Sequence, residues 1–571
     1  MAPALKKYDW ILAITTIAFV FSSASNGAND VANSYATSVA ARTLKMWHAG
    51  LLACVTEFVG AVALGSKVTT TIKSGVFGLS KFQPIPPTFM LVMGCAEVGN
   101  TTQTVVGALA GAGIAAQTPL KWAWVSGSLS QIAASWAIAP LIAAGISATL
   151  FLTLKFLVLE RKDPFKWGMR LIPWYLAFTA GVLALFIMDE LPNAEDFEEM
   201  GAGKVTGIIL GVSGGVLLFS YVFFVPYFHR RLVKNDARIR AWHIPLGPLL
   251  YRQKPPIYFP GKGERVVKDY YAKSSVETAE TDLERAHMKD DKDQPINLGS
   301  ENNGDAITTA FDGKDADSSD SKERTRGGLS IPNVDRLTAH IIPAKPEPEE
   351  RWLEPVRHLP IYSPKKLANW TKYALFQGVS RDVVTQKNLD AVHARAIVYD
   401  NRVEHLWTYA QVASAIMMSI AHGSNDVANA VGPWVASYNT YTSGEVTSKA
   451  NTPIWILVVA GLLLGLGFWF YGYHVMRSLG NKITQVSPTR GFSMELGAAI
   501  TVLLASRLAL PVSTTQCLTG ATVGVALCNF DVRAVNWKQV AFIFSSWVIT
   551  LPSAGLISGL LMAMALNTPH F

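Results

Sequence analysis

Long apolar runs dominate this sequence and limit what it can fold into. Residues 120–154 and 205–228 each exceed the roughly 20 apolar residues that a helix needs to cross a bilayer. The apolar residues follow one another in runs and do not alternate with polar ones. Only 16% of the residues are charged, whereas a soluble protein carries about 25%. The sequence therefore predicts an all-α, polytopic membrane protein.

The apolar segments form two groups. We expect one transmembrane repeat in residues 1–228 and a second in residues 405–571. Between them, residues 229–404 contain a charge-rich centre, residues 289–328, with little apolar surface to bury, which is typical of disorder. The flanks of this stretch are basic, and positive residues near membrane ends favour the cytoplasm. We therefore expect a cytoplasmic, largely disordered central loop.

The two halves repeat the same motifs in the same order. "NGANDVANS" at residues 26–34 matches "HGSNDVANA" at residues 422–430, and "NTTQTVVGALAG" at 100–111 echoes "STTQCLTGATVG" at 513–524. Duplicated halves are common in secondary transporters, where the binding site lies near the membrane midplane between the repeats. The repetition predicts a transport site built from both halves.

Two aspartates in these repeats, Asp30 and Asp426, lie inside apolar segments. A membrane-buried Asp costs roughly 2.5 to 3.5 kcal/mol and almost always faces a cavity, a partner or an ion. No Lys or Arg lies between Tyr8 and Ala41, or between Thr408 and Ser448. An exogenous cation is therefore the economical partner, although a structural Asp that caps a broken helix is the alternative.

The neighbours of these aspartates are oxygen ligands, which suit hard cations such as Na⁺ and also protons. Backbone carbonyls are expected to join them where Gly27 and Gly423 break the helices. His422 is a weak indication of proton coupling, and a packed or capping role is the favoured interpretation. The expected sodium ligands are Asn29, Asp30, Asn33, Asn425, Asp426 and Asn429.

A hydroxyl-rich motif follows Pro511 in the second half. A proline that interrupts an apolar run ahead of hydroxyl residues is typical of a re-entrant hairpin tip, and the helix N-terminus after it attracts anions. The alternative is that the hydroxyls bond to carbonyls of their own helix. The expected anion-binding residues are Thr101, Thr102, Gln103, Ser513, Thr514, Thr515 and Gln516, with Asp30 and Asp426 beside them.

An anion beside two carboxylates requires cations. At about 4 Å and an effective dielectric near 20, each pair of like charges costs roughly 4 kcal/mol. The cargo and the cations should therefore move together. Three further acids in apolar sequence, Glu57, Glu97 and Glu495, are interpreted equally well as coupling acids (second cation sites or proton carriers) or as neutralised structural acids.

The first copy of the hydroxyl motif is shortened. Glu97 precedes Thr101 by 4 residues, whereas Glu495 precedes Thr514 by 19, so 15 residues are missing. This stretch corresponds to about one helix and the turn before the hydroxyls, and its loss comes from mis-splicing, a wrong gene prediction or a true deletion. We expect half of the anion cradle and its supporting helix to be absent, and this chain to transport poorly or misfold.

At "GANDVAN", "HGSNDVANAVGP", "SPTRGFSMELGAA" and "LPVSTTQCLTGA" the chain resembles the inorganic phosphate transporter family, and most of all its fungal sodium/phosphate symporters of the plasma membrane. The resemblance covers both apolar halves, about 400 residues. It implies two inverted repeats with about twelve spanning segments and two re-entrant hairpins. It also implies phosphate uptake driven by Na⁺ or H⁺ through elevator-like alternating access, often as a homodimer.

The family's site residues map onto the motifs named above. The signature aspartates match Asp30 and Asp426, and the hairpin hydroxyls and the three glutamates match as well. The departure is the first hairpin, where "EVGN" stands before Thr101 in place of the expected Pro-Val-Ser. The expected partners are phosphate, sodium ions and the lipid bilayer, with no cofactor beyond co-transported sodium.

Several alternatives stay open. Proton coupling, or another oxyanion such as sulfate or arsenate, would use the same fold. A membrane phosphatase would need an activated nucleophile or a metal cluster, and the sequence has no Gly-rich Lys-Ser/Thr loop and no paired metal histidines. A phosphate sensor is a less favoured interpretation. The net charge of +8 does not indicate nucleic-acid binding, because the positive residues lie mostly at the ends of apolar segments.

Overall fold

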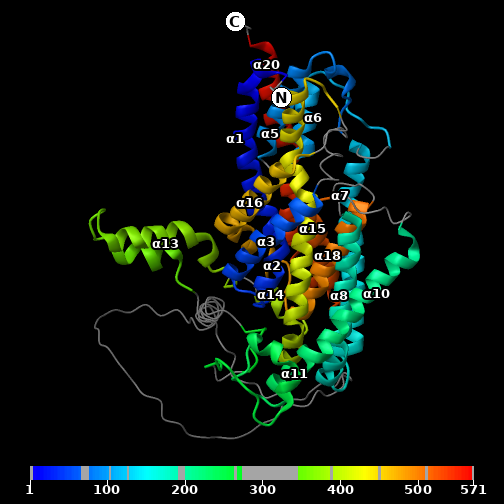
Figure 1. Cartoon of the computed structure of the whole chain (residues 1–571), viewed down its shortest axis with the longest axis vertical. Coiled ribbons are helices and arrows are strands. Elements are labelled where there is room, and N and C mark those ends of the chain that lie inside the picture. The colour runs from blue at the N-terminus through cyan, green and yellow to red at the C-terminus, as the bar shows by residue number, and fades with distance from the viewer. Residues whose placement is uncertain are drawn as a thin grey trace, which may run out of the picture.

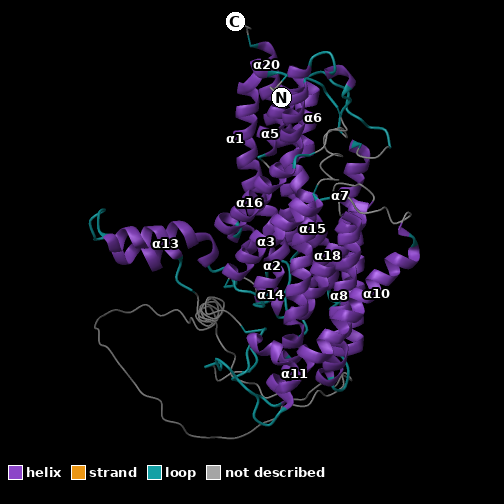
Figure 2. Ribbon diagram, in the orientation of Figure 1, coloured by secondary structure: helices purple, strands orange, loops and turns teal. Residues whose placement is uncertain are grey.

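The computed structural model describes residues 4–65, 76–101, 104–124, 128–190, 200–262, 266–272, 345–385, 390–447, 452–507 and 512–568. Within these ranges the regular structure is helical, and the one extended pairing is an isolated bridge between Phe77 and Leu120. Figure 2 shows the resulting bundle of helices. The predicted all-α fold is confirmed.

Seven helices of the described residues are long and apolar enough to cross a membrane. Their lengths of 18 to 35 residues match the thickness of a bilayer at 1.5 Å per residue. The polytopic prediction is therefore confirmed. These spans are Lys6–Ala40, Met46–Leu64 (α3), Leu129–Leu159, Pro164–Met188, Ala202–Val233, Ile454–Tyr471 (α16) and Trp537–Asn567 (α20).

Several spans combine α-helix with other helical turns. The first consists of η1 (Lys6–Tyr8), α1 (Asp9–Asn26), η2 (Gly27–Val31) and α2 (Ala32–Ala40). The third and fourth are α7 (Leu129–Leu154) with η4 (Lys155–Leu159), and α8 (Pro164–Glu190). The fifth consists of α10 (Ala202–Phe219), η5 (Ser220–Phe224), α11 (Val225–Phe228) and η6 (His229–Val233).

Two helical hairpins occupy equivalent places in the two repeats. The first is α5 (Pro86–Asn100) with α6 (Val105–Ala115), and it packs against α20. The second is α18 (Pro488–Arg507) with α19 (Thr514–Leu527), and it packs against α7. In Figure 1 the labels of α5 and α6 lie well above that of α18.

One helix, α15 (Asn401–Ser443), runs through most of the bundle without interruption. The expected break at Gly423 is therefore wrong, and Gly27 begins a π-helical turn, η2, instead of a break. Close packing explains both glycines. A Cβ on Gly27 would lie 2.0 Å from the Leu464 carbonyl oxygen, and one on Gly423 would lie 2.7 Å from the Glu57 carbonyl oxygen.

The first hairpin is shorter than the second, but its supporting helix is present. Helix α5 ends 3 residues after Glu97, whereas α18 ends 12 residues after Glu495. The expectation of a missing helix is therefore wrong. Most of the 15 missing residues correspond to the C-terminal end of α18, so α5 is shorter there. The remainder correspond to the connection between the two helices of the hairpin.

The described parts of the central segment form helices, of which α13 extends sideways from the bundle (Figure 1). The expected disordered centre, residues 289–328, lies outside the described residues. The second half begins at Asn401, the start of α15, four residues before the expected boundary at residue 405. The helices here are η7 (Ala241–Tyr251), η8 (Glu349–Leu353), η9 (Glu354–Val356), α13 (Pro364–Ser380) and α14 (Asp390–His393).

Candidate functional site

The two signature aspartates meet where the first span crosses α15. Asp30 lies on η2 and Asp426 on α15, and each has a ligand atom within 4.8 Å of the other and of His422. Asp426 is buried and Asp30 is partly buried. At that separation and an effective dielectric near 20, two ionised carboxylates repel each other by about 3.5 kcal/mol. A cation between them would turn this repulsion into attraction.

The hydroxyl tip of the second hairpin lies directly on these aspartates. Thr515 Oγ1 donates a hydrogen bond to Asp30 Oδ1 at 3.0 Å, and Thr514 Oγ1 donates one to Asp426 Oδ2 at 2.8 Å. Both threonines belong to the first turn of α19, whose N-cap is Ser513. Ser513 Oγ accepts a hydrogen bond from the backbone N–H of Gln516 at 3.4 Å. The positive end of a helix dipole therefore meets the paired carboxylates.

The asparagines of the two motifs hold this arrangement together. Asn425 Nδ2 donates to the Val512 carbonyl at 3.1 Å, just ahead of the hairpin tip. Asn429 Nδ2 donates to Asp426 Oδ1 at 3.2 Å, and Asn33 Nδ2 donates to Thr515 Oγ1. Asn29 lies beside Asp30 on the same turn of η2. Five of the six expected sodium ligands, all but Asn29, thus make hydrogen bonds around one point.

Two carbonyl oxygens near this point are buried without a hydrogen-bond partner among the described residues. They are Asn33 Oδ1 and Gln516 Oε1. Buried polar atoms are normally satisfied, so each such atom needs an explanation. An oxygen-ligated cation would provide one, because both atoms are neutral oxygen donors of the kind that hard cations accept.

The tip of the first hairpin reaches the same neighbourhood by other contacts. Asn100 Nδ2 donates to the Asn429 carbonyl at 2.7 Å, and Ser25 Oγ donates to the Thr101 carbonyl at 3.4 Å. The Thr101 hydroxyl donates to the carbonyl of Val98 in its own helix, as the alternative interpretation of these hydroxyls expects. Thr102 and Gln103 lie outside the described residues, so their predicted role stays a prediction.

Glu57 and His422 extend the site into the bundle. His422 Nδ1 lies 2.7 Å from Glu57 Oε2, and its Nε2 lies 2.9 Å from Asp426 Oδ2. All three side chains are buried, and Ser419 Oγ donates to Glu57 Oε1 at 2.5 Å. A protonated imidazole carries a proton on both ring nitrogens. Between these two carboxylates it would supply the counter-charge that the local sequence lacks.

The sequence predicted a packed or capping role for His422 and no role for Ser419, whereas both side chains contact the buried acids here. The available signal was helical spacing: Ser419, His422, Asp426 and Asn429 follow one another at three or four residues, which places them on one face of a helix. In the part of the chain that the structure describes, no Lys or Arg forms an ion pair with Asp30 or Asp426. The position of Glu57 opposite His422 depends on how α3 packs against α15, which no local pattern contains.

Glu97 and Glu495 connect the hairpins to the central helices. Glu97 on α5 accepts a hydrogen bond from Ser22 of α1. Glu495 on α18 accepts from Thr37 and Ser38 of α2, at 2.5 and 2.6 Å, and from Ser414 of α15 at 2.6 Å. Within the described part of the chain, neither glutamate forms a hydrogen bond or an ion pair with the aspartate pair. The geometry favours the structural interpretation for these two acids and a site role for Glu57.

Comparisons with known proteins agree with this geometry. A family model described as "Phosphate transporter family" matches residues 26–558. The chain is 37% identical to the phosphate-repressible phosphate permease pho-4 of Neurospora crassa, and the alignment covers 99% of each protein. It is 26% identical to sodium-dependent phosphate transporter 1 of Rattus norvegicus, over 99% of this chain and 96% of that protein.

A solved structure described as "The sodium-dependent phosphate transporter" has the same fold. It superposes with a TM-score of 0.60 at 21% sequence identity, and covers 98% of this chain and 100% of its own. At this identity the likeness supports the arrangement of helices alone. The inverted-repeat architecture is thus found in a protein whose sequence has diverged widely from this one.

Proposed function

This chain belongs to the phosphate transporter family, and from that premise we propose that it takes up inorganic phosphate together with sodium ions. The family and the relatives named above are transporters and not enzymes. The Rattus relative is named for sodium dependence, which supports sodium as the coupling ion here. The helices that are long and apolar enough to span a bilayer supply the membrane path.

One observation carries the proposal: the first turn of α19 touches both signature aspartates. Thr514 and Thr515 donate to Asp426 and Asp30, respectively. The same helix end can donate backbone N–H groups to an oxyanion. Cations held by the carboxylates would lie next to a phosphate held by the helix end. Phosphate loading would then require cations, since without them the anion would face two negative charges.

We assign the expected residues to these two roles. The proposed sodium ligands are Asn29, Asp30, Asn33, Asn425, Asp426 and Asn429. The proposed phosphate-binding residues are Thr101, Thr102, Gln103, Ser513, Thr514, Thr515 and Gln516, with Asp30 and Asp426 beside them. Glu57 is the proposed coupling acid because His422 joins it to Asp426.

The proposal includes the transport cycle and the assembly that the resemblance implies. Each hairpin packs against one long helix of its own, α5–α6 on α20 and α18–α19 on α7, and both hairpins also contact α15. Elevator-like movement would carry both hairpins and the aspartate pair past the remaining helices. A homodimer is part of the same proposal.

We place the protein in the plasma membrane with the central segment in the cytoplasm. Contacts bring several basic segments to the end of the bundle that carries this segment: Lys268 Nζ donates to the Arg42 carbonyl, Arg395 pairs with Asp531, and Arg402 lies over the Phe165 ring. Arginine and lysine at helix ends favour the cytoplasmic side.

Radiolabelled phosphate uptake tests the function. Cells that lack their own high-affinity uptake would express the chain and be assayed in sodium and in choline medium, at two pH values. We expect uptake only in sodium, and none for Asp30→Asn or Asp426→Asn. Excess sulfate and arsenate would test the choice of anion by competition, and a phosphate ester would test for hydrolysis.

A proton-coupled permease is the second candidate, and the buried Glu57–His422–Asp426 contact favours it. It predicts equal uptake in sodium and choline, with uptake rising as the pH falls. That result would replace sodium coupling with proton coupling and leave the phosphate assignment in place. Phosphate uptake that depends neither on sodium nor on pH would contradict coupling to any of these cations.

A further inference from the structure

Helix α13 extends sideways from the bundle, as Figure 1 shows on the left. Its C-terminal end is fixed to the end of the spanning helix α16. Trp469 Nε1 donates a hydrogen bond to the Leu375 carbonyl at 2.6 Å, and a Cβ on Gly378 would lie 2.3 Å from the Trp469 carbonyl oxygen. Because α16 ends at Tyr471, α13 leaves the bundle at the level where this span reaches the membrane boundary.

One face of α13 is apolar and uncovered. Leu367, Trp370 and Leu375 are 63%, 46% and 50% exposed. Leu367, Trp370 and Ala374 recur at three- and four-residue spacing and form one stripe along the helix, with Leu375 beside Ala374. One border of the stripe is occupied: Tyr373 donates to Glu349 Oε1 at 2.9 Å, which ties the helix to η8. An exposed apolar stripe on a helix at the membrane boundary is the pattern of an interfacial helix.

The charges on α13 are all positive. The helix contains Lys365, Lys366 and Lys372 and no Asp or Glu. Lys365 and Lys372 are exposed, whereas Lys366 Nζ donates to the Leu359 carbonyl at 2.7 Å. Lys365 and Lys372 each lie two residues from a member of the stripe, Leu367 and Trp370, and so occupy the other side of the helix. A basic polar side opposite an apolar one is the pattern of interfacial helices that bind anionic headgroups.

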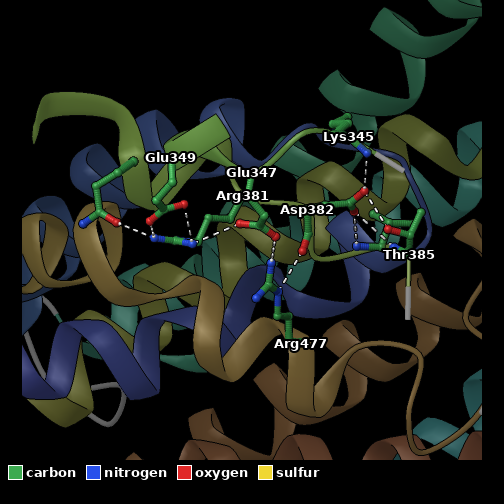
Figure 3. A network of polar contacts seen from close by, with 9 residues as sticks. Lys345, Glu347, Glu349, Arg381, Asp382, Thr385 and Arg477 are labelled. Carbon is green, nitrogen blue, oxygen red and sulfur yellow. Dashed lines mark hydrogen bonds and ion pairs between the residues drawn. The ribbon is translucent and has the colours of Figure 1, made fainter. Parts of the chain in front are cut away.

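Two acids near α13, Glu347 and Glu349, are already paired, as Figure 3 shows. Arg381 lies 3.0 Å from Glu347 and 2.5 Å from Glu349, and Arg477 lies 2.6 Å from Glu347. Burial raises the pKa of Glu349, but hydrogen bonds led by that from Arg381 outweigh it, so the pKa lies below its usual value. Glu349 is therefore ionised at neutral pH, and among the described residues no acid forms an ion pair with Lys365 or Lys372.

From these four observations we propose that α13 lies flat in the membrane interface and binds anionic phospholipid headgroups through Lys365 and Lys372. The occupant of the apolar stripe is lipid, because α13 leaves the bundle at the end of a spanning helix and carries basic side chains on the side of the helix opposite the stripe. The network in Figure 3 also joins the base of α13 to α17 (Tyr473–Leu479), which packs against α2 beside the aspartate site. Lipid on α13 would thus hold the end of the central segment against the transport helices.

Fluorescence of the full-length protein in proteoliposomes tests this placement. Three of the four cysteines are buried, so a Cys54→Ser background carrying Leu367→Cys would place an environment-sensitive probe on the stripe. Asn369→Cys is the matched control, since two residues along a helix lie on nearly opposite sides. Vesicles would contain lipids brominated near the headgroup, with and without phosphatidylserine. Gel-filtration profiles of each variant would verify folding.

We expect the probe at position 367 to be quenched at least twofold more by brominated lipid than the probe at position 369. We also expect phosphatidylserine to increase that quenching, and Lys365→Gln/Lys372→Gln to abolish the increase. Lys234→Gln/Lys254→Gln, which removes two exposed lysines elsewhere, should preserve it.

Three outcomes would overturn the proposal. Quenching of the 367 probe by aqueous iodide and not by lipid would place the stripe in water. Protection from both quenchers would mean that protein covers it, for example a second copy of the chain. Lipid quenching that changes neither with phosphatidylserine nor with the Lys365→Gln/Lys372→Gln substitutions would exclude a role for anionic headgroups.

Discussion

At the scale of single residues, the site depends on one histidine between two acids. His422 contacts Glu57 and Asp426 through its two ring nitrogens, and all three side chains are buried. Removing one partner from a buried ion pair typically lowers the free energy of unfolding by about 3–5 kcal/mol, because the remaining charge is left without compensation. His422 therefore makes the density of acids in the site tolerable before any sodium ion arrives.

We accordingly expect His422→Gln to lower sodium-dependent phosphate uptake at least tenfold and to reduce the yield of folded protein. The glutamine cannot carry a positive charge between Glu57 and Asp426. Uptake per folded transporter is the measurement. The double variant Glu57→Gln/His422→Gln removes one negative charge as well and should recover the folded yield. Full uptake by the single variant would contradict the role given to this histidine.

A second prediction separates the hydroxyl of Thr514 from its methyl group. Thr514→Ser keeps the donor to Asp426 Oδ2 and should transport nearly normally. Thr514→Ala removes a hydrogen bond to a charged group, worth about 1.5–3 kcal/mol, and should raise the half-saturating sodium concentration at least tenfold. Sodium titrations of uptake measure this.

The matched control for Thr514 lies five residues along the same helix. The Thr519 hydroxyl donates to the Thr515 carbonyl of its own backbone, so Thr519→Ala should leave the sodium dependence almost unchanged. If Thr514→Ala and Thr519→Ala changed the half-saturating sodium concentration equally, the hydroxyls would stabilise the helix and would have no specific role in the site.

At the scale of elements, the π-helical turn η2 positions Asp30 because α16 approaches it closely. A Cβ on Gly27 would lie 2.0 Å from the Leu464 carbonyl oxygen of α16. A rigid backbone atom cannot move aside as a flexible side chain can. The glycine therefore sets the distance between the first span and α16.

Gly27→Ala should destabilise the protein by about 1–3 kcal/mol through overpacking and lower the uptake of phosphate. Thermal unfolding in detergent measures the first effect and radiolabelled uptake the second. Gly145→Ala on α7 is the control, since nothing lies within 4 Å of the added methyl group. A Gly27→Ala protein as stable as the control would show that α16 can yield at this contact.

The unequal hairpins give a prediction at the same scale. Inserting residues 499–513, the 15-residue counterpart, ahead of Thr101 would lengthen α5 and restore a Pro-Val-Ser sequence before the threonines. We expect several-fold higher phosphate uptake from the restored chain, because the tip of a longer α5 could present its hydroxyls to the site. Equal uptake by both versions would show that the short hairpin is sufficient.

At the scale of the whole molecule, α10 presents a face on which nothing packs among the described residues. Gly203, Gly207, Gly211 and Gly215 recur every four residues, and an added Cβ would meet nothing within 4 Å at any of them. The other side of α10 is covered by α8, where a Cβ on Gly181 would lie 2.5 Å from Ser213 Oγ. Small residues at this spacing let two membrane helices approach closely.

If the proposed homodimer uses this face, Gly207→Leu/Gly211→Leu should convert dimer to monomer without unfolding the protomer. Native mass spectrometry or light scattering in mild detergent measures the mass. The control is Gly145→Leu, an equally open position on α7. A dimer that survives the double leucine variant would place the contact elsewhere on the surface.

Much of this protein could be predicted from local sequence. Spanning helices follow from the length of the apolar runs, and the duplicated "NDVAN" motif predicts that Asp30 and Asp426 share a site with the hydroxyls near residue 514. These predictions succeed because they depend on the composition of a single segment or on the comparison of two segments. The expected helix break at Gly423 was wrong because a glycine in a helix can also serve close packing.

The sequence by itself determined the membrane class, the repeat and the chemical character of the site: carboxylates, amides and hydroxyls in an apolar medium. Only the tertiary structure decided which partners each buried acid contacts. Glu57 is joined to it through His422, whereas Glu97 and Glu495 bond to serines and a threonine of the central helices. The physical reason is that a buried acid takes its role from whatever partner the packing of distant helices brings within about 3 Å of it.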